Sequence, residues 1–132
     1  MAVGIRNVLI RRYLLLNQFD DALAFYEDLF GEKARLRFDY EAAGLKLAQV
    51  ASLLLIGGAA EQLEGFKATQ ATFLVRDIDD SEHSLIASGC QILRPIKDVP
   101  TGHNMLVKHP DGMIVEYVQH KDPDPADDVY NT

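Results

Sequence analysis

The chain has 132 residues, of which 48% are apolar and 25% are charged, a balance typical of one folded domain whose core needs no disulfide or metal. Thirteen Lys and Arg against twenty Asp and Glu give a net charge of −7, which excludes nucleic acid as an expected partner because its phosphates would be repelled. Cys90 is the single cysteine, and no signal peptide or membrane span is recognisable. We therefore expect a cytoplasmic protein without membrane contact.

An internal repeat organises the sequence. Residues 14–31 and 73–90 align Asp20 with Asp79, an offset of 59 residues. Each copy has an apolar strand, a turn with two carboxylates, an amphipathic helix and a closing glycine. Asp20 and Asp21 are predicted in the first turn of the first helix, where negative charge suits the helix dipole. Helical spacing predicts a buried face in each copy, formed by Ala22, Phe25, Tyr26 and Leu29 in the first and by Leu85 and Ile86 in the second.

Strand-like runs follow each helix. They cover 34–40, 45–50 and 52–56 in the first copy, and 91–96, 104–108 and 113–119 in the second. His109 to Gly112 forms a predicted tight turn between the last two runs. Each copy of the repeat is therefore predicted to have the order strand, helix and three strands.

One domain over residues 1–132 is therefore expected, with a first module at about 6–58 and a second at about 69–120. Residues 57–68 connect the modules. The acidic tail, 121–132, is expected to be mobile or to reach a partner subunit as an arm.

Two motifs carry a resemblance to a known family. One is Asp21-Ala22-Leu23-Ala24-Phe25-Tyr26 followed by Leu29-Phe30-Gly31, and the other is His109-Pro110-Asp111-Gly112 followed by Ile114-Val115-Glu116. From about Arg6 to His120 the chain resembles the glyoxalase, bleomycin-resistance and extradiol-dioxygenase superfamily, also called vicinal oxygen chelate. The resemblance implies an α+β fold in which two βαβββ modules form an incomplete eight-stranded barrel around a concave groove. It also implies a homodimer.

Metal-dependent members of this family place four ligands on the concave face. The resemblance assigns these positions to Arg11, Gln70, a leucine within 53–55, and Glu116. A guanidinium does not ligate a cation, and an amide oxygen is a weak ligand for a zinc-type ion. One strong ligand of four does not hold a divalent transition metal, so we predict neither a metal site nor a cofactor.

Arg11 stands where these relatives commonly have a metal-ligating histidine. Strand alternation places Arg11 and Tyr13 on one face, although Arg12 then falls on the helix-facing side, where a charged residue fits poorly. Our hypothesis is that Arg11 pairs with Glu116 or clamps an anionic ligand, because its forked donors suit a carboxylate. A structural ion pair between strands fits the same residues equally well.

The expected ligand-binding groove is lined by Arg11, Tyr13, Gln70, Thr72, His103, Met105 and Glu116. Its predicted function is metal-independent binding of a small organic molecule, with sequestration of an antibiotic or toxic metabolite as one use. His103 and Glu116 are the candidates for any catalytic role. His109 is interpreted as an exposed turn residue, and Cys90 as a small buried apolar residue.

Two other functions fit the sequence. A metal-dependent lyase, isomerase or dioxygenase would use Glu116 with help from His103 or another histidine. An interaction module with a vestigial groove would have its cleft sealed by side chains such as Leu53, Leu55 and Met105.

Overall fold

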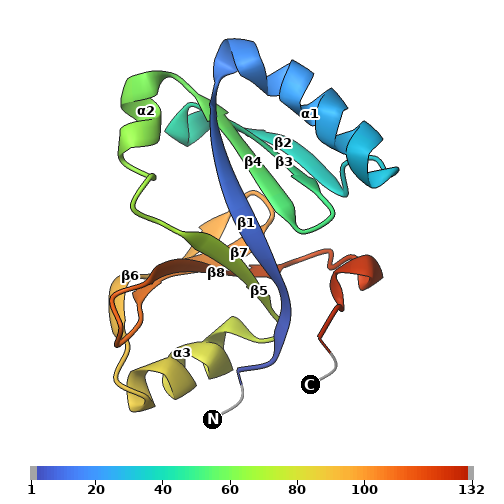
Figure 1. Ribbon diagram of the computed structural model, residues 1–132. Coiled ribbons are helices and arrows are strands. Elements are labelled where there is room, and N and C mark those ends of the chain that lie inside the picture. Colours follow the sequence, from blue (N-terminus) through green and yellow to red (C-terminus); the bar gives the residue numbers. More distant parts are fainter. Residues whose placement is uncertain (1–2, 131–132) are drawn as a thin grey trace. The chain divides into compact units, whose positions relative to one another are not determined.

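The computed structural model describes residues 3–130, which form eight strands and three α-helices (Figure 1). The chain divides into two compact units: the first is Ile10–Ala68, and the second is Met1–Leu9 with Thr69–Thr132. Each unit combines a helix with a sheet, so the prediction of an α+β chain built from two βαβββ modules is confirmed. Within residues 3–130, the helices are too short or too polar to cross a membrane.

The first unit contains the end of β1 (Ile5–Leu15), then α1 (Leu16–Phe30), β2 (Leu36–Tyr40), β3 (Leu45–Val50), β4 (Leu53–Gly58) and α2 (Ala60–Glu64). The strands lie in the order β2-β3-β4-β1. β1 is parallel to β4, and the other pairs are antiparallel. The helix α2 lies inside the predicted connector, 57–68, whose first two glycines belong to β4.

The helix α1 begins earlier than its carboxylates predict. Its first residue is Leu16, and the side chain of Gln18 accepts a hydrogen bond at 3.1 Å from the backbone N–H of Leu15. The prediction that Asp20 and Asp21 occupy the first turn is therefore wrong, since both lie beyond it. The local cause is that an uncharged amide, not a carboxylate, binds the exposed N–H group at this helix start.

The core of the first unit lies between α1 and the sheet. The fully buried side chains of α1 are Phe19 and Leu23, one turn apart. Phe25 and Leu29 are 59% and 63% exposed, so the prediction that they form the buried face is wrong. Phe19 sits so close to β4 that a Cβ atom on Gly57 would lie 2.8 Å from its ring.

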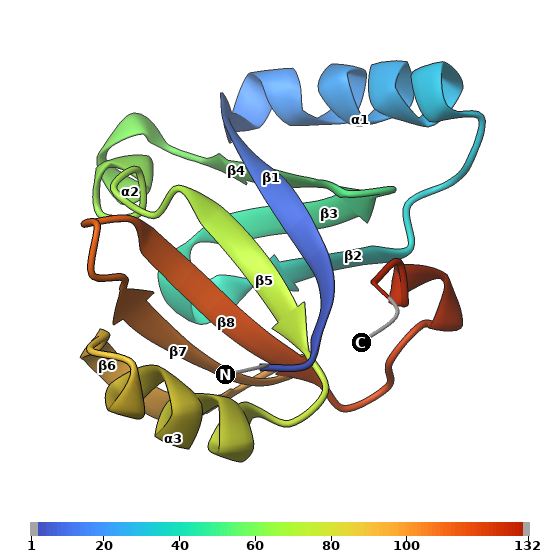
Figure 2. The same cartoon turned by 60° about the horizontal axis from the view of Figure 1, so that its bottom comes forward.

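The second unit contains β5 (Ala71–Val75), α3 (Ile78–Ala87), β6 (Gln91–Val99), β7 (Gly102–Lys108) and β8 (Ile114–His120). These strands lie in the order β5-β8-β7-β6, with β5 parallel to β8 and the rest antiparallel. Figure 2 shows α3 beside this sheet. The core on the α3 side is formed by Val75, Ile78, Leu85, Met105, Val107, Val115 and Tyr117.

The helix α3 follows its prediction more closely than α1 does. The Asp77 side chain accepts a hydrogen bond from the backbone of Asp80 at 3.0 Å and so caps the helix start. Leu85 is 3% exposed, as predicted, but Ile86 is 54% exposed and does not belong to the buried face. The closing glycine, Gly89, has a φ of 88°, a left-handed conformation that glycine adopts without strain.

The tail packs against the second unit. The Arg6 guanidinium contacts the carboxylate of Asp128 at 2.7 Å, and the amide of Asn7 donates to the carboxylate of Asp127 at 3.2 Å. The backbone N–H of Val129 donates to the carbonyl of Arg6 at 3.0 Å, and Asp127 is only 1% exposed. The expectation of a mobile tail is therefore wrong for the described residues up to 130, because buried polar contacts hold it.

Candidate functional site

Glu116 is the centre of a hydrogen-bonded cluster on the sheet of the second unit. Its Oε1 accepts a bond from the Thr72 hydroxyl at 3.2 Å, and its Oε2 accepts one from Nδ2 of Asn104 at 3.1 Å. Thr72 lies opposite Glu116 on β5, whereas Asn104 comes from β7 on the other side. Because side chains alternate along a strand, this cluster lies on the face opposite Tyr117 and α3.

Arg94 extends the cluster from β6. Its Nη2 donates to Oδ1 of Asn104 at 2.5 Å, and its Nη1 donates to the Asn104 carbonyl at 3.4 Å. A guanidinium has only donors, so it must meet the amide oxygen and leave the amide nitrogen to donate to Glu116. Asn104 is 7% exposed and Thr72 is 2% exposed, so the polar groups around the carboxylate are buried and paired.

Asn104 and Arg94 are site residues that the sequence analysis missed. The predicted turn at His109 to Gly112 places Leu106 opposite Glu116, and the residue two before Leu106 must then share its face. That signal could have identified Asn104. The register of Arg94 could not be read in this way, because β6 shifts its pairing on both sides of Arg94.

A second polar cluster lies in the first unit, on β1. Nη1 of Arg11 donates to the Tyr13 hydroxyl at 2.8 Å, and that hydroxyl donates to the carbonyl of Phe66 at 2.6 Å. The guanidinium carbon also lies 5.8 Å from the centre of the Tyr13 ring. The predicted register of this strand is confirmed, since Arg11 and Tyr13 share a face while Leu14 packs with α1. Arg12 falls on the α1 side and is exposed.

Gln70 lies just before β5 and is exposed. Its side-chain oxygen accepts a hydrogen bond from the backbone N–H of Ile114 at 3.2 Å, and the backbone N–H of Gln70 donates to the carbonyl of Ile114 at 2.8 Å. The side chain and the backbone of Gln70 therefore join the beginnings of β5 and β8.

Met105 does not line a surface with Glu116. It is 0% exposed and belongs to the core on the α3 side, so its predicted place in the groove is wrong. His103, two residues earlier, shares that side of β7 by alternation. Its side chain is half exposed, with Nδ1 2.8 Å from the carboxylate of Asp98. The prediction failed because it took β7 one residue out of register, and Asn104 occupies the inner position instead.

The donor set does not fit a divalent metal. Within residues 3–130, no three His, Cys, Asp or Glu side chains come together closely enough to share an ion. The two oxygens of Glu116 accept bonds from Thr72 and Asn104. On β4 the register partner of Arg11 is Leu54, which has no donor atom.

His109 differs from its sequence interpretation. It is partly buried, and its Nε2 lies 2.7 Å from the Tyr117 hydroxyl. Burial raises the pKa of Tyr117, with a smaller contribution from Cys90, so the phenol keeps its proton. Phe73 packs edge-on against Tyr117 with ring centres 5.4 Å apart. The turn therefore forms as predicted, but its histidine points to the α3 side of the sheet and not to solvent.

Comparison with protein families identifies one match. Residues 10–117 fit the model of the Glyoxalase/Bleomycin resistance protein/Dioxygenase superfamily. The sequence matches no curated protein.

Solved structures give similar folds. An uncharacterised protein from Methanosarcina mazei is 40% identical, with a TM-score of 0.83 over 92% of this chain and 97% of that one. Methylmalonyl-CoA epimerase from Mycobacterium tuberculosis is 15% identical, with a TM-score of 0.69 over 92% and 93%. A variant of 4-hydroxymandelate synthase from Streptomyces coelicolor is 17% identical, with a TM-score of 0.58 over 91% and 49%. The last two similarities establish the fold alone.

Proposed function

The chain belongs to the glyoxalase, bleomycin-resistance and dioxygenase superfamily, and on that premise we propose that it binds a small organic molecule without a metal. One observation carries the proposal: both oxygens of Glu116 are engaged by protein donors, Thr72 and Asn104. A metal would need further ligands beside this carboxylate, and within residues 3–130 no three His, Cys, Asp or Glu side chains lie close enough to share an ion. A carboxylate held by two side chains is instead a fixed hydrogen-bond acceptor for a ligand.

The ligand that suits this face of the second unit has a hydrogen-bond donor or a cationic group for Glu116. The net charge of −7 attracts such a molecule over a distance. Arg94 holds Asn104 in one orientation, so the acceptor is rigid before the ligand arrives. Rigidity favours affinity because less conformational freedom is lost on binding.

In the first unit, Arg11 is the group that we propose for binding an anionic molecule. Its bond to the Tyr13 hydroxyl and its position over that ring orient the guanidinium, and the forked geometry of a guanidinium suits a carboxylate. We also propose that the protein is a cytoplasmic homodimer and that it sequesters an antibiotic or a toxic metabolite.

The test is a thermal-shift screen of chelator-treated protein against aromatic and glycopeptide antibiotics, followed by calorimetry on any compound that stabilises it. We expect binding that persists in excess chelator. Glu116→Gln should weaken it by roughly 10-fold or more, as expected when a hydrogen bond to a charged group is lost. Glu61→Gln, on the exposed surface of α2, is the matched control and should bind normally.

Two results would overturn the proposal. One is stoichiometric zinc, nickel, manganese or iron in protein purified without chelator, together with loss of binding when the metal is removed. The other is unchanged affinity in Glu116→Gln. Arg11→Ala tests the polar cluster of the first unit separately, and unchanged affinity for an anionic ligand in that variant would exclude Arg11 as a binding group without bearing on Glu116.

A further inference from the structure

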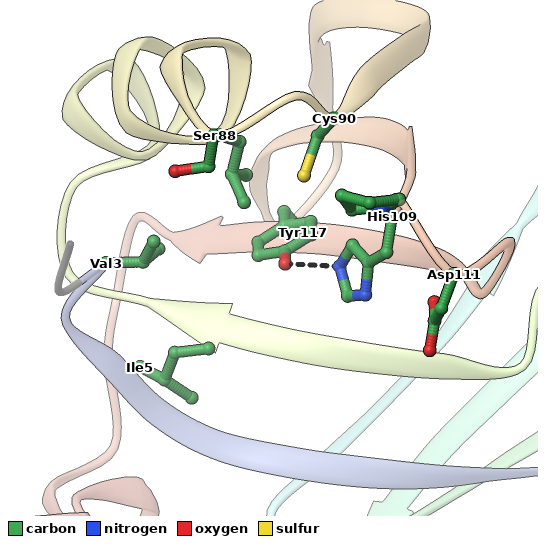
Figure 3. A pocket seen from close by; sticks show the side chains of 9 residues that line it. Val3, Ile5, Ser88, Cys90, His109, Asp111 and Tyr117 are labelled. Atoms are coloured by element: carbon green, nitrogen blue, oxygen red, sulfur yellow. Dashed lines mark hydrogen bonds between the residues drawn. The ribbon is translucent and has the colours of Figure 1, made fainter.

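A cavity of about 560 Å³ lies on the side of the second unit's sheet opposite Glu116. It is bounded by the end of α3, the start of β6, the turn between β7 and β8, and the segment that leads into β1 (Figure 3). The lining residues are Val3, Ile5, Leu85, Ser88, Cys90, His109, Pro110, Asp111 and Tyr117. Small-molecule sites span roughly 300–1,000 Å³, so the cavity has the size of a ligand pocket.

The polar centre of this pocket is the pair formed by His109 and Tyr117, 2.7 Å apart. If the phenol donates to the imidazole, its oxygen accepts a further bond; if the imidazole donates, the phenol proton is left for a ligand. A ligand hydroxyl fits both arrangements, because it is donor and acceptor at once. The raised pKa of Tyr117, caused mainly by burial, keeps the phenol neutral in either case.

The remaining wall selects against negative charge. Among the nine described lining residues none is Lys or Arg, and Asp111 contributes a carboxylate. Val3, Ile5, Leu85 and Pro110 supply apolar surface. The rings of His109 and Tyr117, which both line the pocket, have their centres 5.9 Å apart, so this part of the wall is aromatic and favours an aromatic ring in an edge-on or offset arrangement.

We propose that this pocket is a second binding site, independent of Glu116, for a small uncharged aromatic molecule with one hydroxyl group. The ring lies among the apolar residues, and the hydroxyl bonds to the pair of His109 and Tyr117. The pocket lies within the second unit alone and does not depend on the proposed function.

Cys90 makes the test specific to this site. It is the only cysteine of the chain, it lines the pocket, and it is partly exposed. The rate at which a disulfide reagent labels it at pH 8.5 can be measured with increasing 4-methylphenol. We expect saturable protection of Cys90. Toluene, which lacks the hydroxyl, should protect with roughly 2- to 10-fold lower affinity, the usual effect of one neutral hydrogen bond.

Two variants separate the hydroxyl contact from the charge of the wall. Tyr117→Phe keeps the ring and removes the hydroxyl, so 4-methylphenol and toluene should protect Cys90 equally. Asp111→Asn keeps an oxygen for its bond to the Met113 backbone, 3.0 Å in the native protein, and should allow 4-methylbenzoate to protect where the native protein does not. Asp111→Asn lies in an exposed turn and tests the pocket even if Tyr117→Phe fails to fold.

Glu116→Gln is the control for the opposite face, and it should leave protection by 4-methylphenol unchanged. Absence of protection at any concentration would overturn the second site. Protection by 4-methylbenzoate equal to that by 4-methylphenol in the native protein would overturn the proposed ligand class. Loss of protection in folded Glu116→Gln would overturn the independence of the two sites.

Discussion

The two units repeat one topology, but the large aromatic side chain at the contact between helix and sheet comes from a different element in each. In the first unit the helix contributes Phe19, which packs over Gly57 on β4. The repeat offset carries Phe19 to Ile78, and the strand registers carry Gly57 to Tyr117. The large side chain is therefore on the helix in one unit and on the strand in the other. Both arrangements fill the layer, which is what close packing requires.

The exchange has a chemical consequence. Phe19 places only carbon under α1, whereas Tyr117 brings a hydroxyl under α3, where it meets His109. The helix α3 is also shorter, with 10 residues against 15 in α1. A shorter helix covers less of its sheet, and the uncovered part is where the 560 Å³ cavity lies. A duplicated fold can thus acquire a pocket when the position of one aromatic side chain changes.

The opposite faces of the two sheets differ as well. In the first unit Tyr13 is paired in register with Ile56, and at the matching position of the second unit Thr72 is paired with Glu116. On this face the first unit therefore carries the pair of Arg11 and Tyr13, and the second carries a carboxylate that accepts bonds from an amide and a hydroxyl. Repetition preserved the strand pairing and not the chemistry.

The largest expected effect comes from truncating Phe19, the large side chain that α1 contributes to the core of the first unit. Phe19→Ala should destabilise the protein by about 3–5 kcal/mol, because Phe19 is 1% exposed and its truncation leaves a cavity in the core. Phe25→Ala, on the exposed side of α1, should change stability by less than about 0.5 kcal/mol. Urea denaturation of both variants measures this. Equal losses would mean that α1 presents the wrong face to its sheet in our description.

The next largest loss of stability is expected at Gly57, the smaller residue of the same contact. Gly57→Ala adds a Cβ atom 2.8 Å from the Phe19 ring and should cost about 1–3 kcal/mol through overpacking. Adding Phe19→Leu should recover part of this loss, so that the double variant is more stable than the two single losses predict. Strict additivity in urea denaturation would contradict the contact between these two positions.

The repeat allowed the fold to be predicted because hydrophobic periodicity and turn residues are local signals. The order of elements and the closing glycines at Gly31 and Gly89 followed from them. The inner face of α1 did not, because Phe25 and Leu29 have helical spacing on their own. Which apolar stripe turns inward depends on where the helix begins. The prediction placed Asp20 and Asp21 in the first turn and so set this start too late, whereas α1 begins at Leu16.

The candidate site was harder to predict because it depends on pairing between distant strands. Glu116 and Thr72 were identified, and the structure brings them together at 3.2 Å. Met105 was chosen instead of Asn104 by an error of one residue, which moves a side chain to the other face. Arg94 depends on irregular pairing in β6, for which a single sequence carries no marker.

Below pH 6.5 the two units should differ in stability. His120, in the second unit, has its pKa lowered from 6.5, mainly by burial and in part by Arg6, against the opposing carboxylates of Asp127 and Glu116. The unfolded chain then takes up a proton at a higher pH than the folded protein, so stability falls as the pH falls from 6.5 through the lower folded pKa.

Amide exchange read unit by unit measures this difference. Protection should decrease with falling pH in β7 and β8 more than in β3 and β4. His120→Asn should remove the excess decrease, and His83→Asn, on the exposed side of α3, should retain it. An equal decrease in both units of the native protein would mean that His120 is not the group responsible.

The smallest effect concerns the tail, which only the second unit carries. The hydrogen bond from Arg6 lowers the pKa of Asp128 below 3.8, so this contact stabilises the tail above that pH and is lost as the pH falls through the folded pKa. Because Asp128 is half exposed and salt screens such pairs, Asp128→Asn should speed exchange of the Val129 amide only a few-fold at neutral pH. The matched control, Asp122→Asn, should leave the exchange rate of that amide unchanged.

If exchange in Asp128→Asn equals that of the native protein, the buried contact between Asn7 and Asp127, 3.2 Å long, is sufficient to hold the tail. The difference between the units would then lie in a buried polar pair and not in surface charge.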